Sequence, residues 1–127
     1  MSFDADAVAD EVLSAAAEDW LGLYEVVWCL NTLQPMATVT EKYAAAEEAV
    51  RSLLRSGSVS LYRLPWQEPS TVADLVETAE VEAVLANPQS WSPSLGTDPP
   101  TYIGLATTEE GERELARRAV GGPKQGE

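Results

Sequence analysis

The chain has 127 residues, of which 21 are acidic, eight are basic and none is histidine, so its net charge is −13. The missing histidines exclude catalytic triads and metal sites built on imidazole, and the single cysteine, Cys29, excludes an internal disulfide or a zinc cluster of cysteines. With 45% hydrophobic residues, the length suits one folded domain, which we expect to span residues 1–120.

The first part of the chain is predicted to be helical. Residues 4–18 are rich in alanine, lack glycine and proline, and begin with acidic residues that favour a helix N-terminus. A short extended piece at Trp20 and Leu21 precedes a second helix over 23–33, which ends before Pro35. The apolar stripe of this region predicts that Trp20 and Trp28 lie in the core and that Cys29 is a small buried hydrophobe.

The third helix has a clear start and a clear stop. Thr38 or Thr40 is expected to cap it, and Gly57 is expected to end it in the left-handed conformation, just after Ser56. The expected core stripe consists of Tyr43, Ala46, Val50, Leu53 and Leu54. Residues 58–64 then alternate between polar and apolar side chains, which predicts a half-buried strand that Pro65 terminates.

Residues 65–100 are predicted to form a helical insertion between two strands. Ser70 or Thr71 is expected to cap a helix over 71–87, with Asp74 as the acid of a capping box, and the prolines of 88–100 indicate a loop. The positions expected to face inward are Val72, Leu75, Val76, Ala79, Ala83 and Leu85. A second strand over 102–106 leads into a last helix that Thr108 caps, and residues 121–127 are expected to be a disordered tail.

Two motifs flank the insertion. Residues 49–59 (Ala-Val-Arg-Ser-Leu-Leu-Arg-Ser-Gly-Ser-Val) place a glycine and a hydrophobic residue after a helical Leu-Leu pair, and Thr108 to Gly111 mark the passage from a strand into a helix. Over residues 5–64 and 101–118, this order of elements resembles the winged helix-turn-helix fold. The resemblance implies an α+β, winged-helix-like domain, mostly helical, with a small antiparallel β-hairpin and a helical insertion between its strands. A plain wing has only a few residues there, so the insertion indicates a specialised surface.

The resemblance implies either DNA binding or protein binding, with the third helix in the recognition position. The exposed face of that helix is expected to be mixed rather than basic, since it would carry Glu41, Ala44, Ala45, Glu48, Arg51, Ser52 and Arg55. Only Arg51, Arg55 and Arg63 could contact phosphates or bases, whereas residues 64–112 contain nine acidic residues and no basic one. Charge therefore disfavours nucleic acid as the partner.

No constellation of residues indicates catalysis. Adjacent acidic residues such as Glu47 and Glu48 diverge on a helix, and the sequence has neither a glycine-rich phosphate loop nor a calcium loop. We therefore expect no enzymatic activity, no cofactor and no metal. Trp66 and Trp91 flank the inserted helix, where they either pin the insertion to the body or serve as exposed anchors for a partner. The candidate protein-binding residues are Trp66, Trp91, Glu77, Glu80 and Glu82, the glutamates being expected to face outward.

These observations favour a non-catalytic protein-binding module whose acidic surface binds a basic protein, in an immunity-like or regulatory inhibitory role. A cytoplasmic location is expected, because the chain has no signal-like start, no long apolar run and one cysteine. Three alternatives remain open. The first is a DNA-binding transcription regulator that uses Arg51, Arg55 and Arg63, and the second is a homodimeric accessory or scaffold subunit joined through residues 5–18. The third is a protein with an apolar small-molecule pocket between the insertion and the body.

Overall fold

The computed structural model describes residues 5–65, 74–93 and 101–120. Its elements are α1 (Ala5–Glu18), β1 (Leu21–Gly22), α2 (Leu23–Leu33), α3 (Val39–Arg55), β2 (Val59–Pro65), β3 (Asp74–Leu75), α4 (Thr78–Ala86), the 3₁₀ turn η1 (Pro88–Trp91), β4 (Thr101–Thr107) and α5 (Glu109–Val120). The predicted α+β class, mostly helical with an antiparallel sheet, is confirmed. The predictions for Trp66 and for the tail 121–127 lie outside the described residues.

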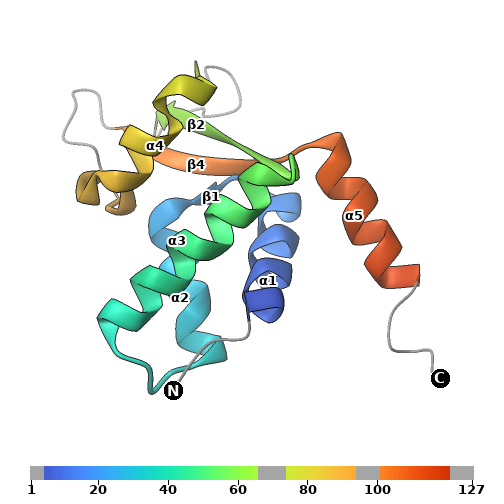
Figure 1. Ribbon diagram of the computed structural model, residues 1–127, viewed down its shortest axis with the longest axis horizontal. Helices are drawn as coiled ribbons and strands as arrows, with labels where there is room; N and C mark the ends of the chain where they lie inside the picture. The colour runs from blue at the N-terminus through green and yellow to red at the C-terminus, as the bar shows by residue number, and fades with distance from the viewer. Residues whose placement is uncertain (1–4, 66–73, 94–100, 121–127) are drawn as a thin grey trace.

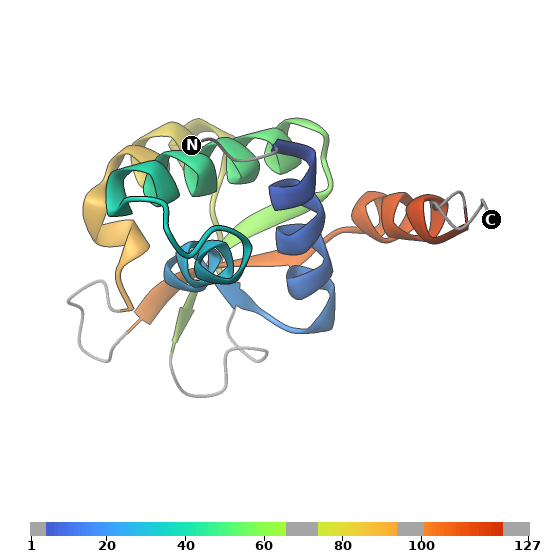
Figure 2. The same ribbon diagram turned by 90° about the horizontal axis from the view of Figure 1, so that it is seen from below.

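Within the described ranges, the sheet has four antiparallel strands in the order β1-β4-β2-β3. The central strands β2 and β4 pair over their whole lengths, from Val59 opposite Thr107 to Pro65 opposite Thr101. The two outer strands are only two residues long. Helices α1, α2 and α3 lie on one side of this sheet, and α5 projects away from the body (Figures 1 and 2).

The hydrophobic core lies between the sheet and α1–α3. Val12, Leu30, Val50, Leu61 and Leu105 are almost fully buried there. Burial of this kind is the main favourable contribution to folding, roughly 1.5–3 kcal/mol for each large apolar side chain.

Tyr62 and Tyr102 follow or precede the core residues Leu61 and Ile103 along their strands, so their side chains lie on the opposite face of the sheet. Trp20 lies edge-on to Tyr62, with ring centroids 5.1 Å apart, and Tyr24 makes similar contacts with Trp28 and Tyr102. The prediction that Trp28 belongs to the core is wrong, because 59% of this residue is exposed. Its side of α2 points away from the buried stripe of Leu23, Val26 and Leu30, and Trp20 is only partly buried.

The predicted ends of α3 are confirmed. Thr38 Oγ1 accepts a hydrogen bond from the Glu41 N–H (3.1 Å), and the Glu41 carboxylate accepts one from the Thr38 N–H (2.8 Å), which completes a capping box. These bonds lower the pKa of Glu41. At the other end, Gly57 has a φ of 76°, as a left-handed stop requires.

The predicted start of the inserted helix is wrong. Asp74 and Leu75 form strand β3 opposite Arg63 and Tyr62, and α4 begins only at Thr78. Of the described positions expected to face inward, Val76 and Leu85 are buried, and Val84 joins them. Leu75, Ala79 and Ala83 are exposed instead. Pairing with β2 outweighs the helical periodicity of residues 74 and 75. The loop expected from Pro88 onward begins with the turn η1.

The Thr108–Gly111 motif joins α5 to the turn between α3 and β2. Thr108 Oγ1 accepts a hydrogen bond from the Gly111 N–H (3.0 Å) and donates one to the Gly57 carbonyl (2.5 Å). A side chain on Gly111 would collide with the carbonyl of Ser58. The motif therefore fixes the point at which α5 leaves the body.

Candidate functional site

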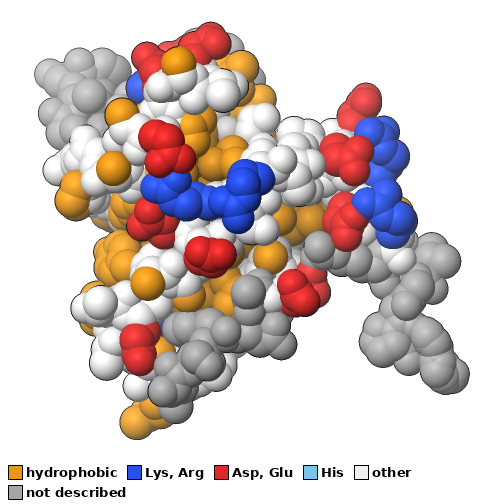
Figure 3. Space-filling model, in the orientation of Figure 1, with side chains coloured by type: hydrophobic (Ala, Val, Ile, Leu, Met, Phe, Trp, Pro, Cys, Tyr) orange, Lys and Arg blue, Asp and Glu red, His pale blue; other side chains and the backbone are white. Residues whose placement is uncertain are grey.

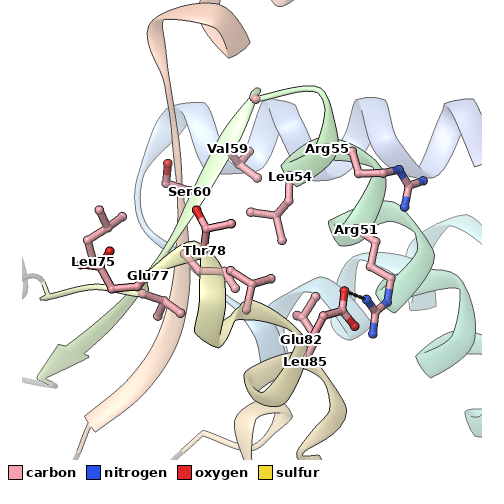
Figure 4. Close-up of a pocket in the computed structure, with 14 residues that line it drawn as sticks. Arg51, Leu54, Arg55, Val59, Ser60, Leu75, Glu77, Thr78, Glu82 and Leu85 are labelled. Atoms are coloured by element: carbon pink, nitrogen blue, oxygen red, sulfur yellow. Dashed lines mark hydrogen bonds and ion pairs between the residues drawn. The ribbon is translucent and has the colours of Figure 1, made fainter.

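A groove of about 580 Å³ lies between the C-terminal half of α3, the start of β2 and the β3–α4 segment (Figure 4). We call it the α3–α4 groove. Gly57 turns the chain sharply between α3 and β2, so the two elements diverge from that point, and α4 lies across the space between them. The groove opens to solvent on the face shown in Figure 3, where apolar side chains are visible between α3 and α4.

The walls of the groove are largely apolar. Leu54 comes from α3, Val59 and Leu61 from β2, and Val81 and Leu85 from α4. Leu54 and Val81 remain partly exposed at the surface of the groove, and Leu75 at its rim is 48% exposed. Partly exposed aliphatic side chains in a concave site can bury further area against a bound molecule, at roughly 25 cal/mol for each Å².

An ion-pair bridge closes one side of the groove. Arg51 donates hydrogen bonds to Glu47 on its own helix (2.8 and 2.9 Å) and to Glu82 of α4 (2.5 Å). Arg51 lowers the pKa of Glu82, and the two carboxylates raise the pKa of Arg51. The bridge therefore ties the insertion to α3.

Two opposite charges at the groove have no partner among the described residues. Arg55 is exposed at the end where α3 stops, and Glu77 is exposed at the end where β3 stops. Within the described ranges, neither side chain makes an ion pair or a side-chain hydrogen bond. The groove thus has one positive and one negative end.

Trp91 is buried, with 6% of its surface exposed, so its interpretation as an exposed anchor is wrong. Its indole N–H donates to the Leu85 carbonyl (3.0 Å), and its ring lies edge-on to Tyr43 of α3, 6.3 Å away between centroids. Trp91 therefore pins the insertion to the body. Tyr43, which was expected in the core, is 43% exposed and lines a smaller cavity of about 360 Å³ on the other side of Leu85.

The other candidate residues differ in whether they form ion pairs with described residues. Arg51 is held by Glu47 and Glu82, and Arg63 lies 3.4 Å from Glu80. Of the three arginines considered for DNA, Arg55 alone is free of ion pairs with described residues. Of the three candidate glutamates, which are all exposed as expected, Glu77 is the one without such a pair.

The sequence suggested an apolar pocket between the insertion and the body only as an alternative and did not identify the residues that line it, although it held a signal for one of them. Leu53 and Leu54 are adjacent on α3, and only Leu53 is buried in the core. Two successive helical residues diverge by about 100°, so a Leu-Leu pair implies a second apolar contact surface. Leu54 faces that second surface, which is the groove.

The described residues contain no cluster of three metal-ligating side chains, and no described helix is long and apolar enough to span a membrane. Cys29 is partly buried, and burial together with Glu11 and Glu25 raises the pKa of its thiol. A thiol with a raised pKa is a weaker nucleophile at neutral pH.

No protein-family model, curated protein or solved structure matches this chain.

Proposed function

We propose that this chain is a non-catalytic protein-binding module and that the α3–α4 groove receives an apolar segment of its partner. The observation that carries the proposal is a solvent-open groove of about 580 Å³ with aliphatic walls and an opposite charge at each end. An apolar centre with a charged rim is the usual composition of a protein-binding surface.

The overall charge favours a basic partner. Four arginines already pair with glutamates of the chain, so much of the net charge of −13 faces solvent uncompensated. Such a field accelerates encounters with a positively charged protein, most strongly at low ionic strength. A role as inhibitor or regulator of a basic protein fits this field.

Two of the alternatives lose support. DNA binding would require Arg51 and Arg63 to leave their glutamates before they contact phosphate. A dimer built on the apolar side of α1 would compete with the core, where Val8, Val12 and Leu13 are buried. A small apolar ligand remains a second candidate, because the volume of the groove lies within the roughly 300–1,000 Å³ of ligand pockets.

Photo-crosslinking from the rim tests the proposal. A photoreactive phenylalanine analogue in place of Leu75 is expected to capture one partner protein in cells of the native host. The same analogue at Ala116, exposed on α5, serves as the matched control. Capture from position 116 as strong as from position 75, or no protein adduct at either, would contradict binding at the groove, and an adduct with a small molecule would support the second candidate.

Ionic strength tests the electrostatic part of the proposal. The affinity for the captured protein is expected to fall as salt rises from low to physiological concentration, because the Debye length shrinks to about 8 Å. Glu77→Lys is expected to weaken binding more than Glu112→Lys, which changes the same charge on distant α5. An affinity that changes neither with salt nor with Glu77→Lys would contradict a role of the acidic surface in binding.

A further inference from the structure

One edge of β2 is only partly covered. On one side, β4 pairs with all of β2, and on the other side the described part of β3 lies opposite Tyr62 and Arg63. The Val76 N–H still donates to the Leu61 carbonyl (2.9 Å), and the chain then turns into α4. Among the described residues, no strand lies beside Val59 and Ser60 on this side.

Alternation along the strand shows which main-chain groups face that gap. The Ser58 carbonyl accepts from the Thr108 N–H (3.0 Å), so the main chain at Ser58 points toward the β4 side. The Leu61 carbonyl points to the β3 side. In an antiparallel ladder, the N–H and carbonyl of every second residue point to the same side, so those of Val59 also point to the β3 side.

Val59 therefore directs its N–H and its carbonyl into the α3–α4 groove, whose lining includes Val59 itself. The described part of the chain places no strand beside these two groups, and the main-chain hydrogen bonds outside the helices and ladders include none to Val59. A strand added at this edge can donate a hydrogen bond to the Val59 carbonyl and accept one from its N–H. The gap spans Val59 and Ser60, which is about 7 Å at roughly 3.3 Å for each residue of a strand.

The charges at the two ends give the occupant a direction. Arg55 lies near the start of β2 and favours an acidic residue, whereas Glu77 lies beside the end of β3 and favours a basic one. Between them, Leu54 and Val81 offer an apolar surface to every second side chain of an extended segment.

We propose that the α3–α4 groove binds an extended segment of the partner protein as an additional β-strand beside Val59. One apolar side chain of that segment packs against Leu54 and Val81, and an acidic residue pairs with Arg55. This inference rests on the proposed function, because it specifies the conformation of the segment that the groove receives. Main-chain hydrogen bonds supply affinity in this mode, and the side chains supply specificity.

A random peptide library displayed on phage, selected against the full chain, provides the probe. The enriched peptides are expected to share an apolar residue two positions from an acidic one and to shift the NMR signals of Leu54, Val59 and Val81. N-methylation of single peptide amides then distinguishes strand pairing from side-chain docking. Methylation of the residue that pairs with Val59 is expected to weaken binding about tenfold or more, and methylation of the next residue is expected to have little effect.

A charge reversal tests the proposed direction. Arg55→Glu is expected to lower the affinity of the chain for the peptide that carries the acidic residue. Replacing that acidic residue by lysine is expected to restore binding to the variant. Arg113→Glu, a change of the same size on α5, is expected to leave both peptides unaffected. Arg55 is exposed, so the variant is expected to keep its fold, which its own NMR spectrum verifies.

The outcomes separate the two proposals. Peptides that bind in the groove but tolerate N-methylation at every amide, or bind as helices, overturn strand addition and leave the proposed function standing. Selected peptides that never perturb the groove overturn both. A concentration-dependent dimer that Arg55→Glu dissolves would identify a second copy of the chain as the occupant and would overturn the assignment to a partner protein.

Discussion

Gly57 and Gly111 meet at Ser58: Gly57 precedes it in the chain, and Gly111 of α5 packs against its carbonyl. The two glycines are needed for different physical reasons. Gly57 adopts a left-handed backbone with open space around it, whereas Gly111 has ordinary helical geometry but no room for a side chain. Substitutions at the two positions are therefore expected to lower the free energy of unfolding by different amounts and to disturb different parts of the structure.

Gly57→Ala is expected to lower the free energy of unfolding by about 1 kcal/mol, the penalty for a Cβ in the left-handed region. No atom lies within 4 Å of the added Cβ, so this loss measures backbone conformation alone. Urea denaturation of Gly57→Ala and Gly57→Asn tests it, and asparagine is expected to lose less. Equal stability of both variants and the wild type would contradict the φ of 76°.

Gly111→Ala is expected to cost about 1–3 kcal/mol, because α5 must move away from Ser58 to admit the methyl group. The NMR signals of Thr108 and Ser58 are expected to shift, since their main-chain hydrogen bond (3.0 Å) lies at this contact. Ala116→Ser, on the exposed side of the same helix, is the control. A loss no greater than that of the control would refute the close approach.

At the scale of elements, the ion pair between Arg51 and Glu82 attaches α4 to α3. Arg51 lowers the pKa of Glu82 below its ordinary value of 4.5 in the folded state. The stability that depends on the Glu82 charge is therefore fully present above pH 4.5 and is lost as the pH falls through the lowered folded pKa.

Glu82→Gln is therefore expected to be less stable than the wild type at pH 7, and the difference is expected to vanish below the folded pKa. Chemical denaturation at neutral and acidic pH measures it. Glu77→Gln, which removes a charge without an ion partner among the described residues, serves as the control. A difference between wild type and Glu82→Gln that stays constant with pH would show that the ion pair does not stabilise the fold.

The sequence predicted the helices and the hairpin where local signals agree with packing. Thr38, Pro35 and Gly57 delimit α2 and α3 through hydrogen bonds or backbone conformation that each residue creates locally. The start of α4 was wrong because the partner of Leu75 is Tyr62, a pairing that no local pattern contains. The residues that line the groove escaped prediction for the same reason, since Leu54 and Val81 come to line one site only after the insertion has docked.

For the whole molecule, the excess of negative charge opposes compaction. Exposed ion pairs such as Arg113–Glu110 contribute little to stability and are few among the described residues, whereas the net charge of −13 generates repulsion among many groups. Screening should therefore weaken the repulsion more than it weakens the ion pairs.

The melting temperature is expected to rise by a few degrees between low salt and about 0.15 M sodium chloride, as the Debye length contracts to roughly 8 Å. Thermal unfolding followed by circular dichroism measures the change. Glu112→Gln, which removes one exposed charge, is expected to show a smaller rise. A melting temperature that falls with salt would mean that ion pairs, rather than net repulsion, dominate the electrostatics of the fold.

The insertion leaves and rejoins the sheet at neighbouring positions, because Pro65 of β2 lies directly opposite Thr101 of β4. Its length can therefore vary without a shift in the register of the central hairpin. Such an arrangement allows the insertion to change in length, by natural variation or by grafting of a foreign loop, while the hairpin and α1–α3 remain constant. The chain thus has the organisation of a scaffold in which the length of an inserted segment is independent of the pairing of the central strands.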